Sequence, residues 1–244
     1  IDGVDALTLT SLFGVTLEAR VGESYGTFMG TGYQTDASGN RLVDASGFYM
    51  ATDERVALGT YLPDFTGGIG NTFTFKNLSL YALIDFQKGG SLHSYSNQWG
   101  KYSGTLEETA EGGIRENGIV VEGVYAPGVI IDDVDVSGQE NTTNIDAQSH
   151  FFSNQGYVIN EADQYDASFV KFREARLSYS LPPLFNNRVA DVEIGIYARN
   201  IAILTKNAPH IDPEVTVSNG NIQGFEGGQL PAQRTIGFNL RFKI

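Results

Sequence analysis

The sequence has 244 residues, and its 29 acidic and 16 basic side chains give it a net charge of −13. A chain this negative repels phosphate backbones, so nucleic acid is not expected as a partner. The sequence contains no cysteine, which excludes disulfides, thiolate metal sites and cysteine nucleophiles. It also lacks a run of about 18 apolar residues, so any membrane crossing has to be made by strands.

Six segments alternate apolar and polar residues with the period of two that is typical of β-strands. They are residues 7–19, 65–75, 78–88, 168–181, 190–200 and 235–244. The last segment is the most regular, with one face formed by Ile236, Phe238, Leu240, Phe242 and Ile244. Glycine, tyrosine and phenylalanine are abundant, and helix-forming residues dominate no window. The sequence therefore predicts an all-β fold.

The segment 168–181 departs from strict alternation. Phe172 and Leu177 both belong to an apolar face, yet they have opposite parity along the chain. One extra residue in a strand reverses the parity of everything after it. The sequence therefore predicts a β-bulge near Arg173 and Glu174.

The connections between these segments alternate between very short and very long. The short links are residues 76–77 and 182–189, and the long ones are residues 22–64, 89–166 and 204–230. The first long connection contains a predicted hairpin around residues 37–40. Short turns at one end and long loops at the other are typical of outer-membrane β-barrels, and segments of about ten residues suit the thickness of a membrane.

Two interpretations of this pattern stay open on the residues alone. A soluble β-sandwich with large loops shows the same alternation, although its strands usually have about five or six residues. A membrane barrel needs more than six strands, because an open sheet would leave two unpaired edges in lipid. The membrane interpretation therefore requires further strands outside this chain.

Several stretches carry specific motifs. Residues 63–73 read P-D-F-T-G-G-I-G-N-T-F, residues 166–174 read D-A-S-F-V-K-F-R-E, and residues 179–182 read Y-S-L-P. Further along are A-R-N at 198–200, D-P-E at 212–214 and P-A-Q-R-T at 231–235. In this order they resemble the motifs of the SusC/RagA family of TonB-dependent outer-membrane transporters from Bacteroidetes. Phe172 stands where the family commonly has Leu, and Ile244 where an aromatic residue is frequent.

The resemblance implies a transmembrane antiparallel β-barrel of about 22 strands, of which this chain would supply the last six. The plug domain and the TonB-contacting segment would lie outside this chain. If the last strand ends in the periplasm, the two short links are periplasmic and the three long segments are extracellular. The implied location is the bacterial outer membrane, with several crossings and a wall in contact with lipid.

The function implied by the resemblance is TonB-dependent active import of a large nutrient, either an oligosaccharide or an oligopeptide. In the family a SusD-like surface lipoprotein covers the barrel and TonB pulls on the plug. Two other classes are alternatives: a passive porin, which would lack a plug, and a soluble structural or adhesive β-domain, which would need no detergent.

Catalytic chemistry has little support in the sequence. The three histidines, His93, His150 and His210, lie in predicted loops without an acid–base partner at motif spacing, so we expect them to be solvated. Hydrolase, zinc-protease and nucleotide-binding motifs are absent from the sequence. We therefore predict that the protein is not an enzyme and needs no cofactor.

One acidic stretch is similar to the opening of a calcium-binding loop. It runs Asp133-x-Asp135-x-Ser137-Gly138, and oxygen atoms at alternate positions can converge on Ca²⁺. At the twelfth position of such a loop, however, this chain has Asn144 instead of Glu. We predict a merely acidic loop and no bound metal.

Three aromatic residues, Tyr95, Trp99 and Tyr102, cluster in the longest connection. Their flat apolar faces can stack on sugar rings or peptide side chains, which makes them candidates for contact with substrate or with the lid lipoprotein. The alternatives are packing within the loop and an aromatic belt at the membrane interface. Mutagenesis of Trp99 and Tyr102 would separate these possibilities.

Charged residues on the predicted polar faces of the strands would line the barrel lumen. They are Asp191, Glu193, Arg199, Arg241 and Lys243. They fit a substrate path, but a plugged barrel also needs polar residues to hold its plug. We favour the plug-facing interpretation.

Overall fold

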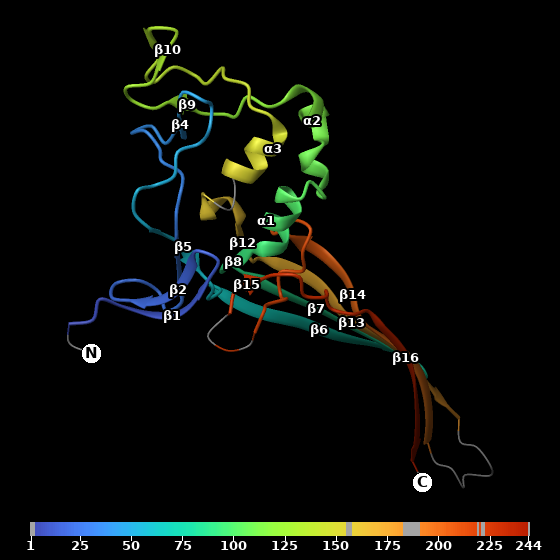
Figure 1. The fold of residues 1–244 in the computed structure, drawn as a ribbon. Helices are drawn as coiled ribbons and strands as arrows, with labels where there is room; N and C mark the ends of the chain where they lie inside the picture. The colour runs from blue at the N-terminus through green and yellow to red at the C-terminus, as the bar shows by residue number, and fades with distance from the viewer. Residues whose placement is uncertain (1–2, 155–157, 183–190, 219, 221–222, 244) are drawn as a thin grey trace. The chain divides into compact units, whose positions relative to one another are not determined.

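The computed structural model describes residues 3–154, 158–182, 191–218, 220 and 223–243 (Figure 1). The chain forms two compact units, and each one is assembled from three separate stretches of sequence. Unit 1 consists of Ile1–Leu62, Ser91–Tyr165 and Thr216–Gln229, and unit 2 consists of Pro63–Gly90, Asp166–Val215 and Leu230–Ile244. Strands dominate the chain, so the predicted all-β class is confirmed.

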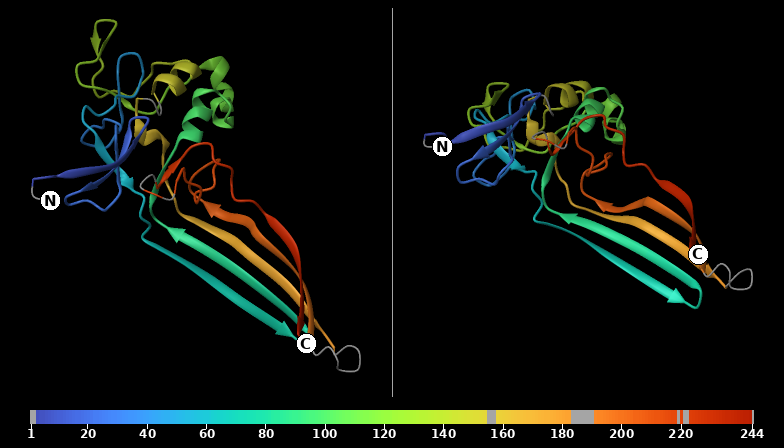
Figure 2. Two further views of the ribbon diagram at one scale, coloured as in Figure 1. Left: turned by 60° about the horizontal axis from the view of Figure 1, so that its bottom comes forward. Right: turned by 90° about the horizontal axis from the view of Figure 1, so that it is seen from below.

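Unit 2 contains one antiparallel sheet of five long strands, in the order β16-β14-β13-β7-β6 (Figure 2). The strands are β6 (Phe65–Phe75), β7 (Leu78–Lys88), β13 (Phe169–Leu181), β14 (Asp191–Lys206) and β16 (Thr235–Lys243). Five of the six predicted strands therefore lie in this sheet, at bounds close to those expected.

The register of this sheet aligns apolar residues across all five strands. Phe73 pairs with Leu80, Leu80 with Leu177, Leu177 with Ile196, and Ile196 with Phe238. The residues of this row are between 38% and 85% exposed. Because side chains alternate between the two faces of a strand, the sheet has one continuous apolar face and one polar face.

The predicted bulge is confirmed. The register of β13 shifts between Phe172 and Glu174 against both of its neighbours. Against β7 the extra residue is Arg173, whereas against β14 the longer stretch is on β14, where Asn200 and Ile201 face Arg173 alone. Phe172 pairs with Ile84 before the bulge and Leu177 with Leu80 after it, which keeps both on the apolar face although their parity differs.

The short connections of the sheet lie at one end and the long ones at the other. Residues 76–77 form a two-residue turn between the paired residues Phe75 and Leu78. The pairing of Leu181 with Val192 brings β13 and β14 together at the same end, although all of the predicted link 182–189 except Pro182 lies outside the described residues. The connections to unit 1 leave from the opposite end.

Unit 1 contains short strands and helices. Its four-stranded antiparallel sheet consists of β1 (Ala6–Leu12), β2 (Val15–Arg20), β3 (Thr27–Gly30) and β5 (Val56–Thr60). A three-stranded sheet contains β12 (Gln164–Asp166), β8 (Ser91–Ser94) and β15 (Phe225–Glu226). Two strand pairs complete it: β4 (Leu42–Val43) with β9 (Val124–Tyr125), and β10 (Ile130–Ile131) with β11 (Val134–Asp135).

The helices of unit 1 are short. They are α1 (Tyr95–Tyr102), α2 (Ile114–Asn117) and α3 (Ala147–Ser149), with 3₁₀ turns at Glu107–Thr109, Glu111–Gly113 and Asn160–Asp163 and a π turn at His150–Asn154. Across the described part of the chain, no helix combines the length and the apolar character that crossing a membrane requires.

The predicted strand 7–19 is wrong as a single element. It is a hairpin of β1 and β2 in unit 1, and the turn is made by Phe13 at φ 41° and Gly14 at φ 90°. The alternation counts Phe13 as a residue of the strand, but glycine readily adopts a positive φ and breaks the extended chain there. The sheet of unit 2 accordingly has five strands instead of the expected six.

The long connections fold around apolar cores within unit 1, among them a small one of Ile114, Ala147 and Phe151 and two larger ones. Val15, Leu17, Phe28, Tyr95 and Phe225 form the first, and Val43, Val121, Tyr125 and Ile145 form the second. These segments are therefore ordered structures instead of plain loops. The predicted hairpin around residues 37–40 is confirmed by the bridge between Thr35 and Arg41.

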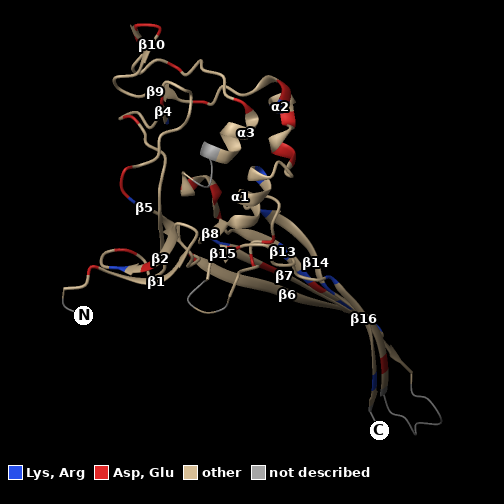
Figure 3. Cartoon of the chain, viewed as in Figure 1, with Lys and Arg blue, Asp and Glu red and all other residues tan. Residues whose placement is uncertain are grey.

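The two units differ sharply in charge (Figure 3). Unit 1 has 21 acidic and 5 basic residues, a net of −16, whereas unit 2 has 8 acidic and 11 basic residues, a net of +3. The negative charge of the whole chain therefore resides in unit 1.

Candidate functional site: a charged cluster on the polar face of the sheet

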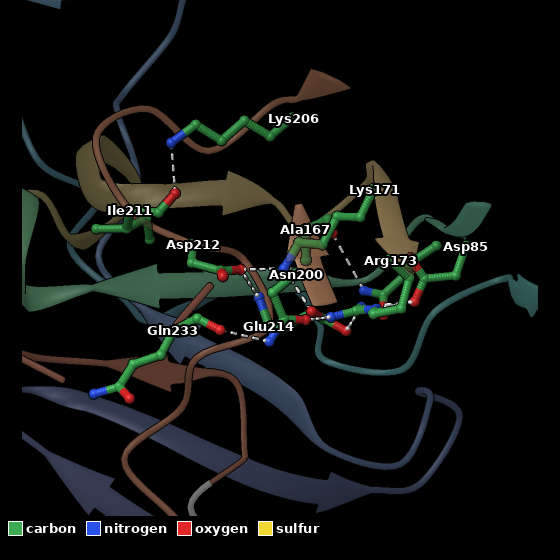
Figure 4. A network of polar contacts seen from close by, with 11 residues as sticks. Asp85, Ala167, Lys171, Arg173, Asn200, Lys206, Ile211, Asp212, Glu214 and Gln233 are labelled. Atoms are coloured by element: carbon green, nitrogen blue, oxygen red, sulfur yellow. Dashed lines mark hydrogen bonds and ion pairs between the residues drawn. The ribbon is translucent and has the colours of Figure 1, made fainter. Parts of the chain in front are cut away.

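A cluster of charged side chains lies on the polar face of the sheet of unit 2 (Figure 4). Lys171 and Arg173 come from β13 and Asp85 from β7, and Asp212 and Glu214 come from the segment that follows β14. The cluster therefore joins motifs that are far apart in the sequence: K-F-R-E at 171–174 and D-P-E at 212–214.

Lys171 is the most buried cation of this cluster. Its Nζ lies 2.5 Å from Asp212 Oδ1 and 2.5 Å from Glu214 Oε2. The side chains of Lys171 and Asp212 are each only 5% exposed. Burial alone would raise the pKa of Asp212, but hydrogen bonds from Lys171 and from the backbone N–H of Glu214 outweigh it and hold that pKa below its usual value.

Arg173 owes its position to the bulge. As the extra residue of β13 it turns its side chain to the polar face, where Nη2 lies 2.6 Å from Asp85 Oδ2 and 2.7 Å from Glu214 Oε1. Its Nη1 donates a hydrogen bond of 2.9 Å to Asn200 Oδ1. The planar guanidinium has donors for three partners at once, which an ammonium group could not place in one plane.

Asn200 links the cluster to the segment before the last strand. Its backbone has a φ of 51°, a left-handed conformation that asparagine tolerates better than most residues. Its side chain accepts the bond from Arg173 and donates another of 3.0 Å to the carbonyl of Gln233. The A-R-N motif therefore has a local structural reason for its asparagine.

A pocket of about 270 Å³ opens beside this cluster within unit 2. Its lining includes Lys171, Arg173 and Asn200, together with Pro231 and Arg234 of the P-A-Q-R-T motif. Lys171 and Arg173 are neutralised by carboxylates, so the cluster has the chemistry of a fixed clamp. Such a clamp can hold the segment after β14 against the sheet.

The other charged residues predicted on the polar face lie outside this cluster. Arg199 Nε lies 3.1 Å from Glu174 Oε2 in a partly exposed pair. Glu193 and Arg241 pair in register on β14 and β16. The side chains of Asp191 and Lys243 lie outside the described part.

Helix α1 holds the three predicted aromatic residues. The helix begins after Ser94, whose side chain accepts a hydrogen bond of 3.1 Å from the backbone N–H of Asn97. Tyr95 is 1% exposed and belongs to the first core of unit 1, so it is a packing residue instead of an accessible contact. Trp99 and Tyr102 are 39% and 45% exposed, which leaves their rings accessible.

Two of the three histidines are not solvated as expected. His93 and His150 are buried, and burial lowers the pKa of each to about 4. His93 packs against Tyr95 with ring centroids 4.8 Å apart, and its Nδ1 lies 3.2 Å from Gln164 Oε1. Only His210 is exposed.

The acidic stretch at 132–138 has a turn-forming role. Asp132 and Asp133, at φ 48° and 64°, form the turn between β10 and β11. Asp135 Oδ1 accepts a bond of 2.9 Å from the backbone N–H of Ser137. Within the described residues no group of three or more His, Asp or Glu side chains is arranged to hold a metal ion.

Known proteins are similar to this chain in sequence and in fold. The chain is 24% identical over 251 residues to TonB-dependent receptor P3 of Formosa agariphila, and 25% identical over 250 residues to TonB-dependent receptor P26 of the same organism. Each alignment covers 91% of this chain and 23% of the receptor. No family model matches the sequence.

Solved structures give the same result for the fold. The RagAB peptide importer in its closed-closed state has a TM-score of 0.54 at 19% identity, and in its open-open state 0.57 at 18% identity. These alignments cover 98% and 100% of this chain and 25% of the importer chain.

By sequence the chain is similar to a part of TonB-dependent receptors, and its fold is that of a part of the RagAB importer chain. The predicted resemblance to the SusC/RagA type is confirmed. The chain spans about a quarter of the length of the relatives that it matches.

Proposed function

We propose that this chain forms part of the wall and the outer loops of a bacterial outer-membrane β-barrel. The observation that carries the proposal is the apolar row Phe73, Leu80, Leu177, Ile196 and Phe238, which crosses all five strands and is exposed. A soluble β-sandwich would bury such a face against a second sheet. In a barrel wall the face contacts lipid, and the polar face with its charged cluster lines the interior.

The complete barrel, in this proposal, has about 22 strands, and its plug and TonB-contacting segment belong to other parts of the protein. Sheet edges do not occur in lipid, so β6 and β16 pair with further strands of the same barrel. The short turn at 76–77 and the link 182–189 face the periplasm. Unit 1, built from the long connections, faces outward.

The transported substrate is a nutrient too large for porins, an oligopeptide or an oligosaccharide. TonB-dependent import supplies the energy, and a SusD-like surface lipoprotein acts as the lid. The similarity to receptors named TonB-dependent, and to a structure described as a peptide importer, supports this assignment. Trp99 and Tyr102 are the residues of helix α1 that remain accessible for contact with substrate or lid.

Energy-dependent uptake is the property that tests the proposal. Cells producing the protein are offered labelled oligopeptides and labelled oligosaccharides, with and without a protonophore that removes the energy for TonB. We expect uptake of one of the two classes and its loss with the protonophore. Uptake unaffected by the protonophore would support a passive porin, and a protein that stays monodisperse without detergent would support the soluble β-domain.

A further inference from the structure

A pocket of unit 1 lies at the ends of β4 and β9. It has a volume of about 640 Å³ and is lined by Arg41, Tyr49, Glu122, Glu140 and Asn141 among others. Pockets that bind small ligands commonly have volumes of about 300 to 1,000 Å³. The pocket is therefore large enough for a few residues of a peptide or a short sugar chain.

The backbone around this pocket is held by hydrogen bonds. The backbone N–H of Val124 donates a bond of 2.9 Å to the carbonyl of Arg41, where β4 and β9 run parallel. The side-chain amide of Asn141 donates a bond of 3.0 Å to the carbonyl of Val121. The backbone that carries the lining residues is therefore held before a ligand arrives, which reduces the entropy lost on binding.

Arg41 differs from every other basic residue of unit 1. Its guanidinium carbon lies 3.8 Å from the centroid of the Tyr33 ring and 5.4 Å from that of Tyr49. The other four basic residues of unit 1 all donate hydrogen bonds to carboxylates or carbonyls; they are Arg20, Arg55, Lys101 and Arg115. Among the contacts of the described residues, Arg41 has no hydrogen-bond acceptor.

This absence is informative because unit 1 has 21 acidic residues, any of which would attract a cation. Stacking on the tyrosine ring occupies a face of the guanidinium and leaves the N–H groups in its plane unused. An exposed guanidinium fixed in this way is suited to the bidentate binding of a carboxylate.

Two carboxylates share the pocket with Arg41. Glu122 and Glu140 both line it, both are exposed, and neither has an ion pair or a side-chain hydrogen bond within the described part of the molecule. The pocket therefore offers one stacked donor group and two acceptor groups, for which the described residues provide no hydrogen-bond or ion-pair partner.

We infer that this pocket binds a short peptide through both of its charges, with Arg41 on a carboxylate and Glu122 or Glu140 on an ammonium group. An acidic oligosaccharide satisfies only Arg41 and is repelled by the two glutamates, and a neutral one offers no charge to either sign. The inference rests on the proposed import function and assigns its substrate to the peptide class.

Binding to the purified protein in detergent tests the inference without any need for energy. One probe is the tetrapeptide Ala-Lys-Ala-Ala with free ends, and a second is the same tetrapeptide with its N-terminus acetylated and its C-terminus amidated. The other probes are a neutral and an acidic oligosaccharide. We expect the peptide with free ends to bind. Removal of its terminal carboxylate by amidation should weaken binding by about ten- to a hundredfold.

Variants locate the binding in this pocket. Arg41→Ala should weaken binding of the free peptide by about ten- to a hundredfold, and Arg41→Lys should restore only part of it because lysine lacks the planar fork. Arg20→Ala is the matched control, since Arg20 is also a surface arginine of unit 1 but pairs with Glu18. The double variant Glu122→Gln, Glu140→Gln should remove the preference for a free ammonium group. A normal barrel shift on unheated gels verifies that each variant folds.

Equal peptide binding by Arg41→Ala and Arg20→Ala would overturn the inference, as would tight binding of an acidic oligosaccharide with no peptide binding. The outcome is separable from that of the proposed function. If peptides bind through Arg41 but uptake in cells ignores the protonophore, the import proposal fails and the peptide site stands.

Discussion

The two units of this chain place their apolar side chains in opposite ways. Among the described residues, 16 of the 20 buried hydrophobic ones belong to unit 1, where they form cores. Unit 2 exposes a row of large apolar residues on one face of its sheet and keeps its charged cluster on the other. The same hydrophobic effect gives both results if water surrounds unit 1 and lipid surrounds the apolar face of unit 2. The four predictions that follow test this difference, in order of decreasing effect.

Breaking the charged cluster should have the largest effect. Lys171→Met leaves the buried carboxylate of Asp212 without its cation, and such a change costs about 3–5 kcal/mol of stability. The matched control is Arg199→Met, whose pair with Glu174 has side chains 62% and 24% exposed and should cost less than about 1 kcal/mol. Urea unfolding of the protein in lipid vesicles measures the loss of stability in both variants.

The double variant Lys171→Met, Asp212→Asn should recover part of the loss, because the uncompensated charge is then removed. Equal destabilisation by Lys171→Met and Arg199→Met would mean that the cluster is not a clamp.

A charge on the apolar face should have the next largest effect. Ile69→Lys places an ammonium group on the exposed apolar face of β6 and should cost about 2–4 kcal/mol in a bilayer. Thr72→Lys, on the polar face of the same strand, should cost much less. Unfolding in vesicles and the yield of folded protein give the comparison. Similar costs for both variants would contradict the assignment of lipid to one face only.

Unit 1 should weaken below neutral pH, because His93 is buried and its pKa is lowered to about 4 from 6.5. The unfolded chain binds the proton more readily than the folded one between these values, so stability is present at pH 7 and is lost as the pH falls. The slope is about 1.4 kcal/mol per pH unit for this residue. Hydrogen exchange of the β8 amides, corrected for their intrinsic exchange rates, measures this pH dependence of stability.

His93→Gln should flatten this dependence, leaving the share that comes from His150. The exchange of β13 in unit 2 is the internal reference. A slope that persists unchanged in His93→Gln would assign the effect to other groups.

The smallest effect should come from two related turns of unit 1. Gly39 and Gly47, at φ 85° and 84°, close the turns D-A-S-G-N and D-A-S-G-F. Replacement by alanine costs about 1–2 kcal/mol at either position because of the left-handed backbone. A new Cβ at Gly47 would also come within 3.0 Å of Thr143, whereas nothing lies within 4 Å of Gly39. Protease sensitivity of unit 1 should therefore rise more in Gly47→Ala than in Gly39→Ala.

The strands of unit 2 were predictable because apolar and polar residues alternate along each of them, which shows which side chains share a face. Even the bulge follows from the change of parity between Phe172 and Leu177, since both must reach the same face. The hairpin of β1 and β2 was missed because Phe13 and Gly14 preserve the alternation by chance. In that segment the positive φ of Gly14, not the apolar pattern, decides the structure.

The charged cluster was harder to predict from the sequence. Its motifs follow from the resemblance, but the contact between Lys171 and Asp212 joins residues 41 positions apart, and alternation carries no information on such a pair. The turn at 44–47 could have been found, because it repeats the D-A-S-G of residues 36–39. In both copies the Asp Oδ1 accepts a bond of 2.8 Å from the backbone N–H of the serine.

The three-stranded sheet of unit 1 has a consequence for the order of assembly. Its parallel pair joins His93 to Phe225, and Ser94 bonds to Glu226 across 132 positions of sequence. A chain that emerges from its N-terminal end cannot close this sheet until residues 225–226 are available, after β6, β7, β13 and β14 have all been made. Closure of so long a loop is entropically costly and slow. Completion of this sheet is therefore a late event, and its exchange protection would report when residues 225–226 have joined unit 1.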